Sequence, residues 1–397
     1  MGFSQALSGL NAAAQNLDVV GNNIANSQTY GFKGSGVQFA DVYTGSDVGQ
    51  GVRVAAVLQD FSGGTLESTG RNLDLGINGD GFLRFKQDDQ VVYSRNGQLT
   101  MTPDGYLENA SGARLTGFPA GVGTGGQPEV LRIPAEAMPA QATKNISESF
   151  NLDASTVPPN PAVPFIDPTT GKPDPDGYDY ANTGTVYDSL GVQHTQTTYF
   201  TKTGDNEWQV HVAVDGNVAT GMDTLTFNSN GTLSNSTSPT YQYTPPGGAA
   251  PMEFTVDFTG TTQFGNDFAL SSLTQNGWAS GTLVGISFDQ SGNIIGNYSN
   301  EQSQILGTVT LADFRNPEGL KSAGDNVWVE SGNSGQPILG IADSGQFGTL
   351  EGGTLEASNV DLTQELVDLI VAQRNYQANT QTIKVQDEVL QSAVNLR

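Results

Sequence analysis

Cysteine is absent from this chain of 397 residues. Disulfide bonds, thiol nucleophiles and thiolate metal ligands are therefore excluded. Basic residues are scarce, since 16 Lys and Arg stand against 41 Asp and Glu, and the net charge of −25 argues against nucleic acid and anionic membrane as partners. No stretch approaches the roughly 18 apolar residues of a membrane span, and the N-terminus lacks the features of a cleaved secretory signal. These absences alone predict a cytosolic protein.

The residues that are present have the composition of a folded protein. Hydrophobic residues make up 36% of the chain, and its 50 glycines raise the apolar share to about half, as in globular domains. A chain of this length is too long for one core and suggests two to four domains. Residues 1–40 have no net charge and residues 360–397 have a net charge of −2. The acidic middle is expected to stay solvated while the near-neutral ends pack.

Both ends carry apolar or small residues in steps of four and three, which is typical of coiled-coil helices. The N-terminal stripe consists of Phe3, Leu7, Leu10, Ala14, Leu17, Gly21 and Ile24, and the C-terminal stripe consists of Leu362, Leu366, Leu369, Tyr376, Ile383, Leu390 and Val394. A polar run after Ile24 ends the first predicted helix, and Asp361 is the expected N-cap of the second.

Each stripe needs a partner to cover it. The two helices could pair within one chain as an ordinary helical hairpin, which would close the chain into a nested loop. That pair alone would be marginal, because burial of the stripe does not offset the ordering of about sixty residues and helical hydrogen bonds return only part of the difference. Further apolar residues widen the surface beyond what one partner covers, namely Val19, Val20, Val367, Ile370, Val371 and Val389. We therefore favour packing between subunits, and predict a building block for self-assembly.

The middle of the chain has the pattern of mainly antiparallel β structure, with short runs of period two between turn sequences. One predicted hairpin joins residues 73–77 to 82–85 through an Asn-Gly-Asp-Gly turn, and another joins 282–288 to 294–298. The second hairpin and a strand at 305–311 are expected to complete a sheet begun at 70–147. The Pro-rich segment 156–182 predicts a long loop. The expected fold is α+β and multidomain, with the terminal helices paired as a coiled coil and nested β domains between them.

Patterns for catalysis, metals or cofactors are weak. A G-x-G-x-x-G match at residues 121–126 is not followed by the helix of a βαβ unit, which favours a flexible loop. The acidic cluster at 174–179 lacks the first and last carboxylates of an EF-hand loop, which favours a solvated loop. His194 and His211 lie on strand-like segments and are expected to be structural. No catalytic residue, metal or cofactor is predicted, and the chain is expected not to be an enzyme.

Two terminal motifs are more specific than these patterns. The first ends in Asn22, Asn23, Ile24, Ala25 and Asn26 followed by Gly31, Phe32 and Lys33, and the second covers 355–362 and 372–384. Together they resemble the motifs of the bacterial flagellar axial family, which comprises rod, hook and hook-associated proteins. Segments at 39–41, 93–97, 296–302 and 316–320 are similar to those of hook proteins, and the resemblance is weak across 148–279.

The resemblance implies a structural subunit of the flagellar hook, which self-assembles into a curved helical tube and acts as a flexible universal joint between rod and filament. The large side chains of both stripes would form the assembly interface. The implied divisions are a terminal helical domain (1–24 and 361–397), a connecting arm (25–69 and 350–360), an inner β domain (70–147 and 280–349) and an outer β domain (148–279).

The resemblance also implies partners and a location. The partners are other copies of the chain, the distal rod protein and the hook–filament junction protein at the two ends, and the hook cap and flagellar type III export apparatus during assembly. The location is extracellular, in the flagellar basal body and hook, reached without a cleaved signal peptide, which replaces the cytosolic expectation. Two alternatives stay open: a distal rod or hook-associated protein, and a secreted β-rich adhesin or hydrolase with a carbohydrate-binding cleft.

Overall fold

The structure is a computed structural model that describes residues 3–42, 49–122, 125–235 and 239–395, with side chains described up to residue 392. The chain divides into two compact units. Unit 1 comprises Met1–Ala135, Gly285–Asn297 and Ser303–Arg397, and unit 2 comprises Glu136–Val284 and Tyr298–Gln302. Unit 2 is thus inserted within the sequence of unit 1, and each unit contains its own cluster of buried apolar side chains.

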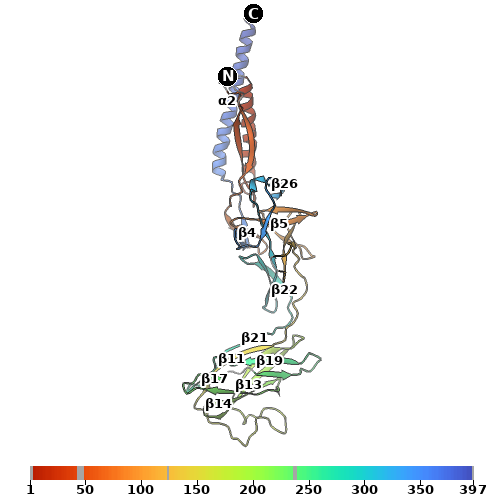
Figure 1. Cartoon of the computed structure of the whole chain (residues 1–397), viewed down its shortest axis with the longest axis vertical. Helices are drawn as coiled ribbons and strands as arrows, with labels where there is room; N and C mark the ends of the chain where they lie inside the picture. Colours follow the sequence, from red (N-terminus) through yellow and green to blue (C-terminus); the bar gives the residue numbers. More distant parts are fainter. Residues whose placement is uncertain (1–2, 43–48, 123–124, 236–238, 396–397) are drawn as a thin grey trace. The chain divides into compact units, whose positions relative to one another are not determined.

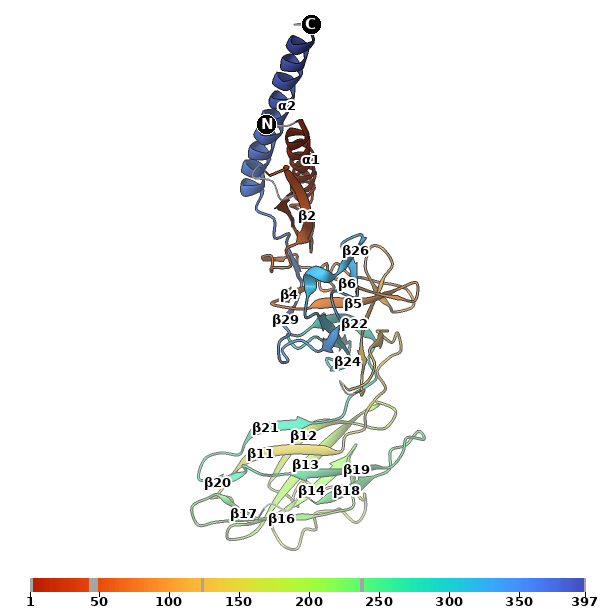
Figure 2. The same cartoon turned by 45° about the horizontal axis from the view of Figure 1, so that its top comes forward.

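The two ends of the chain form the helices α1 (Phe3–Ala25) and α2 (Leu362–Asn395), which lie side by side and antiparallel (Figures 1 and 2). This pairing, with β sheets between the helices in sequence, confirms the predicted fold class. Asp361 caps α2 as predicted, because its Oδ1 accepts hydrogen bonds from the backbone N–H groups of Thr363 and Gln364 at 2.8 and 3.2 Å. The acidic side chain also suits the positive end of the helix dipole.

Two contacts define the axial register of α1 against α2. The Nδ2 of Asn23 donates to Oε1 of Glu365 at 2.8 Å, and a Cβ added at Gly9 would lie 2.9 Å from Oδ1 of Asn379. The residue numbers of each pair add up to 388, so residues of α2 beyond about 385 extend past the first residue of α1. The C-terminal turns of α2 therefore have no part of α1 opposite them.

A β hairpin follows α1 and packs against it. It consists of β1 (Ser35–Asp41) and β2 (Val52–Gln59), paired from Ser35↔Gln59 to Asp41↔Val52. The Nε2 of Gln5 donates to the carbonyl of Gly49 at 2.7 Å, and the N–H of Val52 donates to Oγ of Ser8 at 3.3 Å. The hairpin thus lies along α1 (Figure 2).

The β part of unit 1 is built around one sheet in which segments far apart in sequence are neighbours. Its strand order is β22 (Leu283–Phe288), β23 (Asn293–Tyr298), β24 (Ser303–Val309), β9 (Arg114–Pro119), β5 (Phe82–Gln87), β6 (Gln90–Ser94), β27 (Val327–Val329) and β26 (Lys321–Gly324). Shorter members are β7 (Thr100–Met101), β8 (Leu107–Glu108), β10 (Glu129–Val130), β25 (Leu311–Asp313) and β28 (Ile338–Gly340), and a 3-10 helix spans Pro317–Gly319. The predicted hairpin β22–β23 is confirmed. The prediction that later strands complete the sheet begun at 70–147 is also confirmed, because β24 pairs with β9 and β25 pairs with β5.

The other predicted hairpin is wrong. Strand β4 (Leu75–Asn78) pairs with β29 (Thr349–Gly352) and not with β5, and β3 (Leu66–Ser68) pairs likewise with β30 (Thr354–Glu356). Leu75, Gly76 and Ile77 are all buried, so this strand is covered on both faces and needs a distant partner. The intervening Gly79 and Gly81 have φ values of +110° and +116°, and they turn the chain from one sheet into the next instead of closing a hairpin.

Unit 2 is a sandwich of two sheets. One contains β18 (Thr240–Tyr243), β19 (Met252–Asp257), β11 (Asn145–Asp153), β20 (Thr262–Phe264) and β21 (Ala269–Gln275). The other contains β12 (Tyr180–Tyr187), β13 (Gln193–Gly204), β14 (Glu207–Val214), β15 (Asn217–Val218), β16 (Asp223–Phe227) and β17 (Leu233–Asn235). Most pairs are antiparallel, but β11 runs parallel to β19 and β20. The core between the sheets includes Phe150, Phe200, Trp208 and Phe254.

The chain enters and leaves unit 2 through two segments that are hydrogen-bonded to each other. Backbone bonds join Met138 to Gly281 at 2.8 and 3.1 Å, and join Gln141 to Trp278 at 3.0 and 2.9 Å. The two ends of the insertion are therefore held side by side.

The Pro-rich segment before β12 is an irregular loop, as predicted, with an isolated bridge between Ile166 and Pro173. Phe165 anchors it, because its ring stacks on His211 with centroids 4.0 Å apart and meets Tyr199 edge-on at 5.5 Å. Burial lowers the pKa of His211, which suits a neutral ring stacked on an aromatic one. Of the predicted glycine loop at 121–126, residues 123–124 lie outside the described residues.

Candidate assembly surface and terminal motifs

The most buried side chains of the two helices are mostly small. The buried residues of α1 are Ala6, Ala12, Ala13, Val20 and Asn23. On α2 the most buried described side chain is Ala372, which is 1% exposed. Small residues let two helix backbones approach closely, because the interaxial distance depends on the side chains at the contact. Most of the large apolar side chains of α1 and α2 are therefore left partly or largely exposed.

The predicted N-terminal stripe lies beside this contact. Each of its positions 7, 14, 21 and 24 follows a buried residue by one, which rotates it by about 100° around the helix. Phe3 and Leu7 are 52% and 43% exposed, and Leu10, Leu17 and Ile24 are half-buried. The structure thus leaves the stripe open at its beginning and partly covered toward its end.

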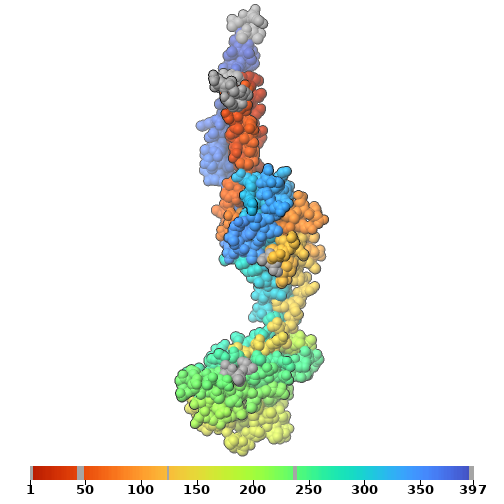
Figure 3. Space-filling view, in the orientation of Figure 1, coloured from red at the N-terminus to blue at the C-terminus, as the bar shows by residue number. Residues whose placement is uncertain are grey.

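The predicted C-terminal stripe is also largely open. Leu369 and Ile383 are half-buried, while Leu362, Leu366, Tyr376 and Leu390 are exposed. The side chain of Val394 lies outside the described residues. Further large apolar residues are exposed on the same helix, namely Val367, Ile370, Val371, Val385 and Val389. We call the exposed large apolar residues of α1 and α2 the apolar helix surface. In the space-filling view the red α1 and the blue α2 lie against each other, and α2 extends beyond α1 (Figure 3).

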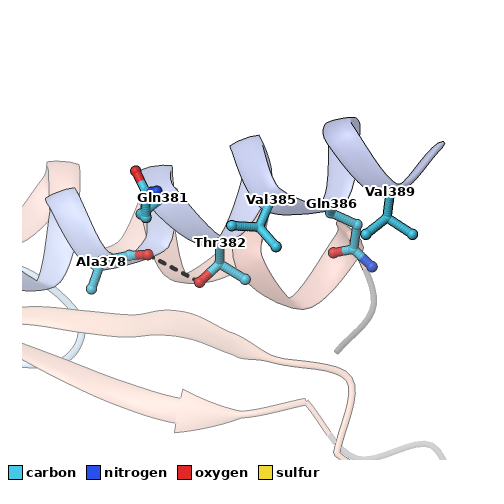
Figure 4. A pocket seen from close by; sticks show the side chains of 6 residues that line it. All are labelled: Ala378, Gln381, Thr382, Val385, Gln386 and Val389. Carbon is cyan, nitrogen blue, oxygen red and sulfur yellow. Dashed lines mark hydrogen bonds between the residues drawn. The ribbon is translucent and has the colours of Figure 1, made fainter. Parts of the chain in front are cut away.

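A hollow of about 570 Å³ lies along the C-terminal half of α2 (Figure 4). It is lined by Ala378, Gln381, Thr382, Val385, Gln386 and Val389. The hydroxyl of Thr382 donates to the carbonyl of Ala378 at 3.0 Å, so this hydroxyl is satisfied within the helix. Val385 and Val389 remain 49% and 61% exposed there, and the hollow continues the apolar helix surface toward the end of the chain.

The N-terminal family motif has a different environment, because its central residue is buried. Asn23 is 2% exposed, and its Nδ2 donates to the carbonyl of Ser35 and to Oε1 of Glu365, each at 2.8 Å. Its Oδ1 accepts from the N–H of Ser35 at 3.0 Å. One amide therefore joins α1, α2 and β1. Neighbouring Asn22 accepts from Nδ2 of Asn26 at 2.9 Å at the end of α1, and Ala25 is exposed.

The Gly31-Phe32-Lys33 part of the motif lies under the helices, at the β part of unit 1. Lys33 is fully buried, and its Nζ lies 2.6 Å from Oε1 of Glu356 and 2.6 Å from the carbonyl of Ser62. Burial lowers the pKa of Lys33, and the Glu356 carboxylate opposes that shift. On the other side, Nη1 of Arg95 lies 3.2 Å from Oε2 of Glu356. Phe32 is also buried.

Arg95 and Glu356 lie in segments that carry the family resemblance, but the sequence predicts no role for either residue. Glu356 is 323 positions from Lys33 and 261 from Arg95, so no local spacing connects them. The available signal was a basic residue in one terminal motif and an acidic residue in the other, within ends that carry few charges.

Unit 2 contains two buried titratable groups, His194, which the sequence predicts to be structural, and Glu148, for which the sequence predicts no role. His194 is held between Asp215, 2.6 Å from Nδ1, and Asp188, 3.3 Å from Nε2. Burial alone would lower the pKa of His194, but hydrogen bonds to the two carboxylates outweigh it and raise that pKa. Glu148 is fully buried, and Oε2 accepts from the hydroxyl of Thr198 at 2.8 Å. Burial raises the pKa of Glu148 to about 7 against this hydrogen bond.

Among the described residues, no group of three or more His, Cys, Asp or Glu side chains could hold a metal ion. The described helices include none that combines the length and apolar character needed to cross a membrane.

Four domain families match consecutive parts of the chain. They are described as Flagella basal body rod protein (residues 4–33), Flagellar hook protein FlgE/F/G D1 domain (76–149), Flagellar basal body protein FlaE D2 domain (151–278) and Flagellar basal body rod FlgEFG protein C-terminal (351–396). Helices at both ends with β units between them, matched in this order, define an axial protein of the bacterial flagellum.

Relatives along the whole chain narrow this class. The flagellar hook protein FlgE of Escherichia coli K12 is 47% identical, with all of both chains covered, and that of Treponema pallidum is 31% identical over 98% of both chains. The chain belongs to the flagellar hook protein family FlgE and is a structural subunit of the hook. The crystal structure of the Helicobacter pylori flagellar hook protein FlgE2 has the same fold, with a TM-score of 0.55 at 12% identity, covering 73% of this chain and all of that one.

Proposed function

We propose that the chain polymerises through the apolar helix surface into the curved helical tube of the hook, and works there as a flexible universal joint that transmits torque from rod to filament. The observation that carries this proposal is the division between the two kinds of side chain on the helices. The most buried residues of the helices are mostly small, and large apolar residues stay exposed on both helices. A surface of this kind on a soluble protein marks an interaction site.

The exposed residues at the start of α2 are enough to matter energetically. Leu362, Leu366, Val367, Ile370 and Val371 are each between 43% and 50% exposed. Burying the exposed half of each such side chain contributes about 1 kcal/mol, or roughly 5 kcal/mol for the five. Because α1 and α2 present different surfaces, a contact from one copy to the next would be heterologous, and such a contact generates a helical polymer when the rotation between copies does not close a ring.

In this proposal the four sequence divisions have separate tasks. The terminal helices (1–24 and 361–397) hold the tube, the arm (25–69 and 350–360) connects them to the β domains, and the inner (70–147 and 280–349) and outer (148–279) β domains slide against neighbouring copies as the tube bends. The negative charge of the middle supports such sliding, because it keeps the outer surfaces solvated.

The partners and the route to the hook are also part of the proposal. The ends of the tube would meet the distal rod protein and the hook–filament junction protein, with the hook cap and the flagellar type III export apparatus acting during assembly. Absence of cysteine suits passage in an unfolded state, since no disulfide has to be opened. The subunit would thus reach the outside of the cell without a cleaved signal peptide.

The test is polymerisation of the full chain with Leu366→Asp, beside the matched control Asn375→Asp, which puts the same charge on an exposed polar position of α2 outside the stripe. In salt that screens the net charge, wild type and Asn375→Asp should form tubes or protofilaments by negative-stain electron microscopy. Leu366→Asp should remain monomeric with an unchanged thermal unfolding profile of its β units. Tubes from Leu366→Asp at the wild-type critical concentration would refute assembly through this surface.

A further inference from the structure

Glu356, at the end of β30, is the meeting point of two buried cations. Its carboxylate contacts Lys33 at 2.6 Å and Arg95 at 3.2 Å, and all three side chains are at most 3% exposed. Lys33 comes from the segment after α1, Arg95 follows β6, and Glu356 precedes α2. Within the described residues, no other carboxylate forms an ion pair with either cation. The ion-paired cluster therefore has one carboxylate for two cations, and Asp60 acts on Lys33 only as a weaker electrostatic neighbour.

The same C-terminal segment satisfies backbone groups of residues 31–64. The N–H of Gly31 donates to the carbonyl of Glu356, and the N–H of Gly64 donates to its Oε1, each at 2.8 Å. The N–H of Gly34 donates to Oδ1 of Asn359, again at 2.8 Å. Buried backbone N–H groups are nearly always paired, so each of these three depends on residues 356–359 for its partner.

At Gly64 and Gly31 the neighbouring backbone lies so close that it leaves no room for a side chain. A Cβ at Gly64 would lie 2.0 Å from the carbonyl oxygen of Ala357, and one at Gly31 would lie 2.5 Å from the backbone nitrogen of Asn96. Gly31 also has a φ of +69°, which side chains rarely adopt. The segment after α1 is thus pressed between the C-terminal strand on one side and the turn after β6 on the other.

We propose that ionised Glu356 is the positioning residue that docks residues 31–34 and 62–64 onto the β part of unit 1, by neutralising Lys33 and Arg95 together. The two terminal motifs then have a role separate from contacts between copies: they form an internal lock that joins the helix pair to the β part. Since Lys33 and Glu356 are 323 positions apart, the lock closes only when both ends of the chain are in place.

The charge count gives the proposal a distinctive signature. Glu356→Gln keeps the shape but leaves two buried cations without a carboxylate, which is strongly unfavourable. Lys33→Met leaves Arg95 and Glu356 as a one-to-one pair. Lys33→Met added to Glu356→Gln removes one of the two stranded cations. Neutralising Glu356 should therefore do more damage than removing Lys33, and the second substitution should partly rescue the first.

The experiment is amide hydrogen exchange of the full-length chain, followed by mass spectrometry of peptides containing Gly31, Gly34 and Gly64, with a β14 peptide of unit 2 as internal reference. Glu356→Gln should accelerate exchange at the three junction peptides at least tenfold and leave the reference unchanged. Lys33→Met alone should stay within about threefold of wild type, and the double variant should exchange more slowly than Glu356→Gln.

Three results would overturn the proposal. Junction exchange in Glu356→Gln at the wild-type rate would show that the charge is not needed for docking. A double variant that exchanges faster than Glu356→Gln would show that shape and not charge holds the segment. Should Glu356→Gln unfold the whole chain, Lys33→Met decides, because a loss of more than tenfold in that variant contradicts the charge account.

Discussion

Glu148 should make the stability of unit 2 depend on pH between about 4.5 and 7. The residue occupies an inward position of β11, between the core residues Ile146 and Phe150, and is fully buried. Its pKa is raised from 4.5 to about 7 by burial. The folded state therefore keeps a proton that the unfolded state has already released, so stability is highest below pH 4.5 and falls as pH rises toward 7.

The magnitude follows from the shift. A pKa difference of about 2.5 at 1.36 kcal/mol per unit corresponds to roughly 3 kcal/mol of unfolding free energy lost between pH 4.5 and 7, with no further loss above 7. Glu148→Gln is neutral at every pH, and its amide oxygen can still accept from Thr198. The variant should lie close to wild type at pH 5 and be more stable by about 2 to 3 kcal/mol at pH 8.

Urea unfolding of the full chain at pH 5 and pH 8 measures this difference when Trp278 and Trp328 are replaced by Phe in every variant, so that the fluorescence reports Trp208 of unit 2 alone. Glu207→Gln is the matched control, because Glu207 is exposed at the start of β14 and should give the wild-type pH dependence. His194 contributes in the same direction at higher pH: its pKa is raised above 6.5, so its stabilisation is present below 6.5 and is lost as pH rises through the folded value. That part should persist in Glu148→Gln.

The reasoning fails if the stability difference between Glu148→Gln and wild type is the same at pH 5 and pH 8 within about 0.5 kcal/mol, which is the usual effect of a surface substitution. Such a result would mean that Glu148 ionises alike in the folded and unfolded chain. A variant less stable than wild type at pH 8 would show instead that the buried carboxylate is stabilising when charged.

Two further predictions concern the terminal helices. Asn23→Ala removes three hydrogen bonds that join α1 to β1 and α2, and should lower the unfolding free energy of unit 1 by about 2 to 3 kcal/mol, whereas Asn22→Ala at an exposed position should cost under about 0.5 kcal/mol; equal losses in chemical denaturation would contradict the assigned role. Asp361→Ala removes the cap of α2 and should cost about 1 kcal/mol, seen as faster hydrogen exchange at Thr363 and Gln364; unchanged exchange there would rule the cap out as a stabilising contact.

The sequence predicted those features that depend on interactions between residues close together in the chain. The cap at Asp361, the hairpin from β22 to β23 and the helices at both ends all follow from turn chemistry and periodicity within a few residues. The turn at 78–81 was misread because its Asn-Gly-Asp-Gly sequence is typical of hairpins, whereas β4 is buried on both faces and pairs with β29, about 270 positions away. Nothing in residues 73–85 contains that information.

The stripes show a second limit. Their large residues are expected to need a partner. In the structure the buried residues of α1 lie one position before stripe positions 7, 14, 21 and 24, and several large stripe residues stay exposed. Alanine and glycine contribute little to a hydrophobic pattern. The sequence therefore did not predict the burial of Ala6, Ala12 and Ala13, whereas it did indicate the large apolar residues that stay exposed. The assembly interface itself stays a prediction, as do the boundaries of the four divisions.

The paired segments at the two ends of unit 2 should allow the inserted unit to vary in size. Because the bonds from Met138 to Gly281 and from Gln141 to Trp278 fix its two ends together, material can be added to or removed from the inserted unit without changing the gap that the rest of the chain must span. Unit 2 could thus change in size while the helices, the buried junction at Glu356 and the sheet of unit 1 stay as they are.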